Sequence, residues 1–289
     1  MIETTEDSLG SVDVARPRIL TEVLGRHGIS LAKSLGQHFL IDRNHLNKII
    51  TTSEISKATY TLEVGPGAGV LTQLLGRHSA HVTCIELDQR MVAVLKETLA
   101  GLTNSNVIHG DALNTSWQSA FVDGHETRFV ANIPYQITSP LLIKVLEHQP
   151  KFASATVLIQ KEVAERIVAK PGTKQFGALT CIAQFLCDCR IASVVPKTVF
   201  FPPPKVDSAV LHMVPHNRQH GLSVDEFTAI TRAAFGQRRK TLRNALRDGL
   251  GWSDERLVMV CDAAGVRPEQ RAEELTIELF CQMALAARM

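Results

Sequence analysis

The sequence predicts an α/β protein, in which a mostly parallel β-sheet is covered by helices and a small all-helical region follows. Short apolar segments that end in turn residues alternate with segments of helical periodicity through the first two thirds of the chain. One apolar segment leads directly into a glycine-rich turn and a helix in "TLEVGPGAGVLTQLL" (61–75). After "VPHNRQHG" (214–221), only helical periodicity continues.

The expected strands are the short runs rich in apolar and β-branched residues. They are predicted near 60–65, 81–87, 106–110, 127–132, 155–160, 190–195 and 206–214. The amphipathic stretches between them predict helices at about 44–51, 68–77, 88–100, 138–148, 161–169 and 177–187. This alternation is typical of a parallel sheet, whose strands end at a common edge.

Capping residues predict where several helices begin and end. In "ITSP", Thr138 or Ser139 is the expected N-cap, and Pro140 then lies in the first helical turn. In the C-terminal region the expected helix starts are Ser223, Ser253 and Pro268, and the expected stop is Gly265.

The chain divides into three predicted parts. Residues 1–30 are an N-terminal extension, of which the first ~15 residues are expected to form a loose tail. Residues 31–215 form the α/β domain, and residues 216–289 form the helical domain. The polar, turn-prone stretch 214–221 marks the boundary between these two domains.

The composition is that of an ordinary soluble globular protein. Lys and Arg number 31 against 29 Asp and Glu, and this net charge of +2 is too small to indicate a nucleic-acid partner. No apolar run approaches the ~18 to 20 residues of a membrane span. The polar start also lacks the charged-then-apolar order of a signal peptide. We therefore expect a cytoplasmic protein that has no membrane contact.

The cysteines are expected to be reduced and to bind no metal. Six of them in 289 residues are too sparse for a disulfide scaffold. Cys187 and Cys189 lack the C-x-x-C spacing of zinc and redox sites, and no further ligand follows at a suitable distance. They are interpreted as buried apolar side chains.

One segment concentrates positive charge. "GQRRKTLRNALR" (236–247) has no acidic residue and contains Arg238, Arg239, Lys240, Arg243 and Arg247. A local patch of this kind is suited to contact phosphates. The alternative, equally compatible with the segment alone, is the solvated face of a helix.

The glycine-rich turn predicts a ligand site. Gly65, Gly67 and Gly69 allow a sharp bend and let a ligand lie against bare backbone, close to the N-terminal N–H groups of a helix. The pattern departs from the dinucleotide fingerprint, because Val70 stands where that fingerprint has another small residue. A nicotinamide dehydrogenase is therefore the least favoured function.

The next two predicted strand ends carry acidic residues. Glu86 in "CIELD" is placed to accept hydrogen bonds from two ribose hydroxyls, and Asp111 in "HGDAL" from an adenine amino group. Each acid has an alternative role as a strand-end turn residue or a helix cap. Together with the glycine turn they indicate a nucleoside, which fits either a nicotinamide cofactor or S-adenosylmethionine.

The fourth strand end, "NIPY" (132–135), favours methyl transfer to an amine. The side-chain oxygen of Asn132 and the carbonyl of Ile133 can accept hydrogen bonds from the amino group of an adenine, while Pro134 fixes the bend. Tyr135 can stack on the base, a contact worth roughly 1–3 kcal/mol. Displacement at a sulfonium methyl group needs position more than a strong base. The alternative is a capped turn with a half-buried tyrosine.

Seven motifs resemble, in order, those of the ribosomal RNA adenine dimethyltransferases. They are "SLGQHFLID" (34–42), "LEVGPGAGVLT" (62–72), "IELD" (85–88), "GDAL" (110–113), "NIPYQITSPLL" (132–142), "FFPPPKVDSAV" (200–210) and "RRKTLRNAL" (238–246). The resemblance implies a Rossmann-like class I methyltransferase sheet with helices on both faces, a helical C-terminal domain, and S-adenosylmethionine as the methyl donor. Within the family, the chain is most similar to the branch that dimethylates two adjacent adenosines near the 3′ end of 16S rRNA.

The resemblance also implies which residues contact the donor. It adds His38 and Leu40 of "GQHFL" to the positions already singled out, which are Gly65, Gly67, Glu86, Asp111 and Asn132. His38 stands where the family commonly has Asn, so a backbone contact or an imidazole contact would serve there instead.

The resemblance further implies contacts with the RNA. Phe200 is the expected second face of the target base, with Phe201 and core packing as the alternatives. Lys205 is expected to face phosphate, and the basic C-terminal segment to dock a monomer on the 30S subunit or its precursor. The alternatives are a 23S rRNA adenine methyltransferase of the macrolide-resistance type and a non-catalytic RNA-binding or transcription-accessory relative.

Overall fold

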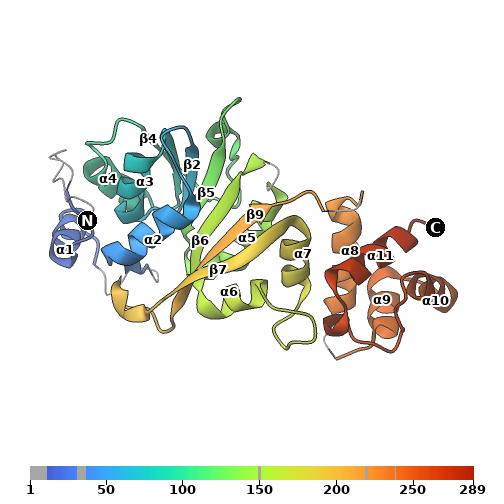
Figure 1. The fold of residues 1–289 in the computed structure, drawn as a ribbon. Helices are drawn as coiled ribbons and strands as arrows, with labels where there is room; N and C mark the ends of the chain where they lie inside the picture. The colour runs from blue at the N-terminus through green and yellow to red at the C-terminus, as the bar shows by residue number, and fades with distance from the viewer. Residues whose placement is uncertain (1–11, 31–36, 149–150, 219–220, 238) are drawn as a thin grey trace. The chain divides into compact units, whose positions relative to one another are not determined.

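A seven-stranded sheet organises the first part of the molecule (Figure 1). The computed structural model describes residues 12–30, 37–148, 151–218, 221–237 and 239–289. The strand order is β4-β3-β2-β5-β6-β9-β7. The strands are β2 (Tyr60–Val64), β3 (His81–Glu86), β4 (Ser105–His109), β5 (Thr127–Asn132), β6 (Ser154–Gln160), β7 (Cys187–Val195) and β9 (Ser208–Pro215).

Five neighbouring strands of this sheet are parallel. β3 pairs with β4 and β2, β2 pairs with β5, and β5 pairs with β6, each in parallel register. Their carboxyl ends therefore meet at one edge, where open α/β sheets bind ligands. The predicted fold class and all seven predicted strands are confirmed.

Helices follow most of these strands, as the periodicity predicts. In the α/β part they are α2 (Arg43–Ser53), α3 (Val70–His78), α4 (Gln89–Thr98), α5 (Thr138–Glu147), α6 (Lys161–Ile167) and α7 (Ala178–Leu186). The C-terminal helices are α8 (Val224–Phe235), α9 (Leu242–Leu250), α10 (Asp254–Ala263) and α11 (Ile277–Ala286). None of the helices among the described residues is long and apolar enough to span a membrane.

The chain forms two compact units. One comprises residues 1–161 and 191–212, and the other comprises residues 162–190 and 213–289. The second unit therefore contains most of α6, all of α7 and the four C-terminal helices. The second unit has its own core, in which the rings of Phe185 and Phe227 stack at a centroid distance of 3.9 Å. The functional division at residue 215 stays a prediction.

The predicted N-terminal extension contains a helix that the sequence reading missed. α1 (Pro17–Arg26) buries Leu20, Val23 and Leu24 in the same apolar cluster as residues of α2, α3 and α4. Glu97 of α4 pairs with Arg26 and with His27, whose Nε2 lies 2.8 Å from the carboxylate. Most of the predicted loose tail lies outside the described residues.

Two short strands were also missed. β1 (Phe39–Leu40) and β8 (Phe200–Phe201) form a separate antiparallel pair, in which Leu40 lies opposite Phe200 and Phe39 opposite Phe201. Two-residue strands have no recognisable periodicity, and these two are far apart in the sequence.

Two of the predicted helix starts are wrong. α5 begins at Thr138 itself, whose hydroxyl donates to the Pro134 carbonyl oxygen at 3.4 Å, so neither Thr138 nor Ser139 is the N-cap. Pro268 lies in a turn and begins no helix. The next α-helix, α11, begins at Ile277, and Thr276 is its N-cap. Ser223 and Ser253 are N-caps as predicted, and Gly265, at φ 66°, follows the end of α10.

Candidate active site

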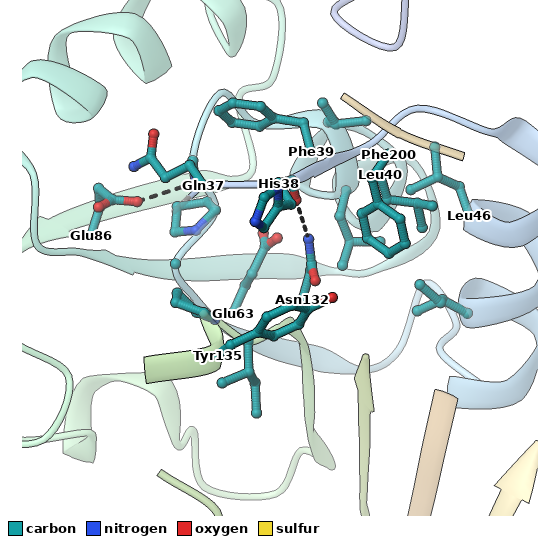
Figure 2. Close-up of a pocket in the computed structure, with 18 residues that line it drawn as sticks. Gln37, His38, Phe39, Leu40, Leu46, Glu63, Glu86, Asn132, Tyr135 and Phe200 are labelled. Atoms are coloured by element: carbon teal, nitrogen blue, oxygen red, sulfur yellow. Dashed lines mark hydrogen bonds between the residues drawn. The ribbon is translucent and has the colours of Figure 1, made fainter. Parts of the chain in front are cut away.

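A cavity lies at the carboxyl ends of β2, β3 and β5 (Figure 2). Its walls come from six segments that are distant in sequence: residues 37–40, α2, residues 63–71 with the glycine turn, Glu86 at the end of β3, the turn 132–135 and β8. Ten of the predicted site residues line it: His38, Leu40, Gly65, Gly67, Glu86, Asn132, Ile133, Pro134, Tyr135 and Phe200. The fold thus brings together most of the positions that the sequence singles out.

The glycine turn forms one wall by excluding side chains. Gly65, Gly67 and Gly69 have φ values of 68°, 57° and 87°, in the left-handed region that favours glycine. A Cβ on Gly67 would lie 2.9 Å from Phe39 Cε1, and one on Gly65 would lie 3.2 Å from Pro134 Cδ. Only bare backbone fits between these neighbours, which leaves the peptide groups of the turn accessible to a ligand.

Glu86 is a buried carboxylate at the end of β3. Its Oε2 accepts the Gly67 N–H at 3.1 Å, and its Oε1 accepts the Asp88 N–H at 2.9 Å. Burial raises the pKa of Glu86, and these backbone hydrogen bonds oppose that rise. Because each carboxylate oxygen has two acceptor positions, Glu86 can hold the glycine turn and still accept hydroxyl groups from a ligand.

Glu63 is a second buried acid on the cavity wall, and the sequence reading gave it no role. Its side chain is 1% exposed, and Oε2 accepts the Thr72 hydroxyl at 2.7 Å and the Cys84 thiol at 3.7 Å. Burial raises the pKa of Glu63 to about 8. The available signal was a charged residue inside the otherwise apolar strand "TLEV".

The turn after β5 presents Asn132 and Tyr135 at the cavity (Figure 2). Asn132 Nδ2 donates to the His38 carbonyl oxygen at 3.2 Å, an orientation that leaves its Oδ1 as an acceptor. The Tyr135 hydroxyl is 2.7 Å from Ser208 Oγ, and the Tyr135 and His38 rings are 5.9 Å apart. These contacts hold the amide and the aromatic ring in fixed positions.

The β1–β8 pair builds the opposite wall. It places Leu40 beside Phe200, which is 3% exposed and lines the cavity, whereas Phe201 is not among the lining residues that the structure describes. His38 Nδ1 lies 2.8 Å from the Pro202 carbonyl oxygen, so its ring fastens the two segments together. The His38 backbone oxygen is the atom that meets Asn132.

Gln37 is a further lining residue that the sequence reading missed. Its Oε1 is buried and has no hydrogen-bond partner among the described residues. Leaving a buried acceptor unpaired costs roughly 1–3 kcal/mol, so a polar ligand group at this position would be favoured. Gln37 lies within the motif "SLGQHFLID" (34–42), but only the packing of the fold shows that its side-chain oxygen is buried and unpaired.

Asp111 is the predicted donor residue that does not line the cavity. It follows β4, where His109 lies opposite Glu86, so it belongs to the same sheet edge. Its Oδ1 accepts the Leu113 N–H at 2.9 Å, which makes it a turn residue as well. Leu87, which directly follows Glu86 at the end of β3, is a large apolar side chain that is 66% exposed and that the sequence reading also missed.

The basic segment is partly neutralised by the fold. Arg243 lies 3.3 Å from Glu269 and 3.7 Å from Asp254, acids that the linear segment does not contain. Arg239 and Lys240 are exposed, whereas Arg238 lies outside the described residues. Lys205, in the other compact unit, is also exposed.

The cysteines are free thiols, and Cys187 is buried while Cys189 is half-buried. Within the described ranges, no group of three or more His, Cys, Asp or Glu side chains is arranged to hold a metal ion.

Comparisons with known proteins cover nearly the whole chain. A family profile described as "Ribosomal RNA adenine dimethylase" matches residues 28–288. The protein named "Ribosomal RNA small subunit methyltransferase A" from Anoxybacillus flavithermus is 40% identical to this chain, over 94% of this chain and 95% of its own length. The protein of that name from Listeria monocytogenes is also 40% identical, over 95% of this chain and 96% of its own length.

Two solved structures are similar over most of the chain. A dimethyladenosine transferase from Plasmodium falciparum has a TM-score of 0.71 and 29% identity, covering 85% of this chain and 96% of its own. The 23S rRNA methyltransferase ErmE has a TM-score of 0.66 and 26% identity, covering 87% of this chain and 100% of its own.

Proposed function

The chain belongs to the ribosomal RNA adenine dimethylase family, and from that premise we propose that it dimethylates N6 of two adjacent adenosines in 16S rRNA. The target bases are those of the 3′-terminal hairpin loop, and the methyl donor is S-adenosylmethionine. The observation that supports this most directly is the cavity where Asn132 and Tyr135 meet the glycine turn and two buried acids. The names of the small-subunit relatives, at 40% identity, favour the small-subunit substrate.

The cavity residues fit S-adenosylmethionine. Glu86 is placed to accept its ribose hydroxyls, and the bare backbone around Gly67 admits the nucleoside closely. Glu63 provides a buried carboxyl group whose ionised form the cationic part of the donor would favour, and the unpaired Gln37 Oε1 provides an acceptor. Leu87, exposed next to Glu86 at the end of β3, offers an apolar surface for the adenine ring.

The turn 132–135 holds the target base. Asn132 Oδ1 and the Ile133 carbonyl accept hydrogen bonds from the adenine amino group, which localises its lone pair on the nitrogen. Tyr135, whose hydroxyl is tied to Ser208, stacks on the ring, and Phe200 faces its other side. Bound S-adenosylmethionine supplies the electrophilic methyl group. The residues of this chain act by aligning nitrogen and methyl carbon and by excluding water.

RNA docking is assigned to Lys and Arg side chains. Lys205 and the segment that contains Arg238, Arg239, Lys240 and Arg243 are proposed to contact phosphates of the 30S subunit or its precursor, with the protein acting as a monomer in the cytoplasm. Arg243 contributes less to phosphate binding than its position in the sequence implies, because Glu269 and Asp254 partly neutralise its charge.

The function is tested by mass spectrometry of ribosomal RNA from cells with and without this protein. We expect two adjacent dimethyladenosines in the 16S hairpin loop only when the protein is present. New methylation of 23S rRNA instead would favour the macrolide-resistance type of enzyme. Lack of S-adenosylmethionine binding in calorimetry would favour a non-catalytic relative.

Replacing Glu86 with Gln is expected to weaken S-adenosylmethionine binding about ten- to a hundredfold, since hydrogen bonds to a charged group contribute roughly 1.5–3 kcal/mol. Calorimetry with the folded variant gives the dissociation constant. The matched control is Glu162→Gln, an exposed carboxylate that pairs with Arg166 on α6. Equal donor affinity in Glu86→Gln and in the control would remove Glu86 from the donor site.

A further inference from the structure

Lys144 of α5 occupies a cage of backbone carbonyls in the segment that follows β4. Its Nζ donates to the carbonyl oxygens of Ala112, Leu113 and Thr115, at 2.8, 2.9 and 2.9 Å. An ammonium group has three N–H donors, so these bonds use all of them. The same Nζ lies 4.8 Å from the centroid of the Trp117 ring, whose Nε1 donates to the Ala112 oxygen.

The caged segment is the one that holds Asp111. Asp111 Oδ1 accepts the Leu113 N–H at 2.9 Å, and Oδ2 accepts the Asn114 side-chain amide at 2.7 Å. The Asp111 carbonyl oxygen accepts the Thr115 N–H at 2.7 Å. Residues 111–115 therefore form one hydrogen-bonded turn, and a displacement of its carbonyls also displaces the Asp111 carboxylate.

The other end of α5 starts at the turn that holds the target base. The Pro134 carbonyl oxygen accepts the Ile137 N–H at 3.1 Å and the Thr138 hydroxyl at 3.4 Å. From Thr138 to Lys144 the helix rises about 9 Å. One rigid element thus connects the base-binding turn to the Asp111 turn, and Lys144 makes the second of these two attachments.

The charge of Lys144 also interacts with the carboxylate of Asp111 in this turn. Burial lowers the pKa of Lys144, and the carboxylates of Asp111 and Glu147 oppose that effect. Removing the ammonium group would leave three carbonyl oxygens without this partner. An arginine would not restore the cage, because its planar fork cannot direct three donors from one atom.

We propose that Lys144 is a positioning residue for the donor: it fixes the 111–115 turn so that Asp111 meets the adenine amino group of S-adenosylmethionine. This inference rests on the proposed function, in which Asp111 is a donor residue. Lys144 itself touches neither the donor nor the target base. Its loss should therefore change donor affinity and leave the chemical step at saturating donor unchanged.

The test compares Lys144→Met with Lys151→Met. Lys151 also lies over an aromatic ring, 5.2 Å from the Phe121 centroid, but it is exposed and its Nζ donates to the Gln118 side-chain oxygen at 3.1 Å. We expect Lys144→Met to raise the dissociation constant of S-adenosylmethionine at least about tenfold, which corresponds to 1.4 kcal/mol. kcat on undermethylated small subunits at saturating donor should stay at the wild-type value, and Lys151→Met should change neither quantity.

Lys144→Arg is the second variant, because it keeps the positive charge and guards against a Met variant that does not fold. It too is expected to bind the donor more weakly than wild type. Wild-type donor affinity in both Lys144 variants would overturn the proposal, and so would a fall in kcat at unchanged affinity. If the wild-type protein itself does not bind S-adenosylmethionine, the proposed function fails first, which distinguishes the two failures.

Discussion

Replacing Asn132 with Ala is expected to reduce kcat for methyl transfer by roughly a hundred- to a thousandfold, the effect of removing one hydrogen bond that is strongest in the transition state. The lost group is the Oδ1 acceptor, which the bond from Nδ2 to the His38 carbonyl orients toward the cavity. Folding and donor binding should persist, because Gly67, Glu63 and Glu86 are untouched.

The measurement is single-turnover methylation of undermethylated 30S subunits, with donor affinity measured separately by calorimetry. The matched control is Asn106→Ala, the same substitution at an exposed position of β4. Turnover by Asn132→Ala within a few-fold of the control would show that the amide does not activate the adenine. If Asn132→Ala loses both donor binding and turnover, Asn132 belongs to the donor site and not to the base site.

Replacing Glu63 with Gln is expected to stabilise the protein at alkaline pH. The folded pKa is about 8 and the ordinary value is 4.5, so the folded state keeps a proton that the unfolded state loses over this range. Stability contributed by protonated Glu63 is fully present below about pH 4.5 and falls as pH rises toward 8, by about 1.4 kcal/mol per pH unit. Above pH 8, the total loss of folding stability caused by Glu63 is therefore at most about 5 kcal/mol.

Because glutamine does not titrate, Glu63→Gln should unfold at a higher temperature than wild type at pH 9 and at a similar temperature at pH 5. Thermal unfolding without donor, scanned across this pH range, gives the difference. Glu162→Gln is the control, because it makes the same substitution at an exposed side chain. Parallel pH dependences for wild type and Glu63→Gln would contradict the prediction. The stabilised variant should bind S-adenosylmethionine less tightly, as expected where a functional site reduces stability.

Much of the fold was predictable because its main strands are buried and apolar. β2, β3, β5 and β6 are such runs, and each is followed by a segment of helical periodicity. The β1–β8 pair was not predictable, since each strand has two residues and the pairing depends on the whole intervening fold. α1 carried a readable signal, with apolar residues at 20, 23 and 24, but its polar surroundings concealed it.

Three positions of the site were predictable because each stands at or directly after a strand end, whereas Asp111, which also follows a strand, does not line the cavity. Gly65, Glu86 and Asn132 follow from the rule that parallel strands end at one edge. Glu63 acquires its raised pKa only from burial, and Gln37 its unpaired oxygen only from packing, so neither property is visible in the sequence. The ion pairs of Arg243 likewise require the folded helices.

The bond between His38 and the Pro202 carbonyl joins residues 164 positions apart. At a translation rate of about 5–20 residues per second, a nascent chain spends roughly 10–30 s with one side of its pocket made and the other not yet synthesised. The glycine turn, Glu86 and Asn132 all emerge within that interval. Because β8 and β9 are made after all of these residues, newly made protein should complete its pocket late, and fragments that end before residue 200 should lack the Phe200 wall that faces the target base.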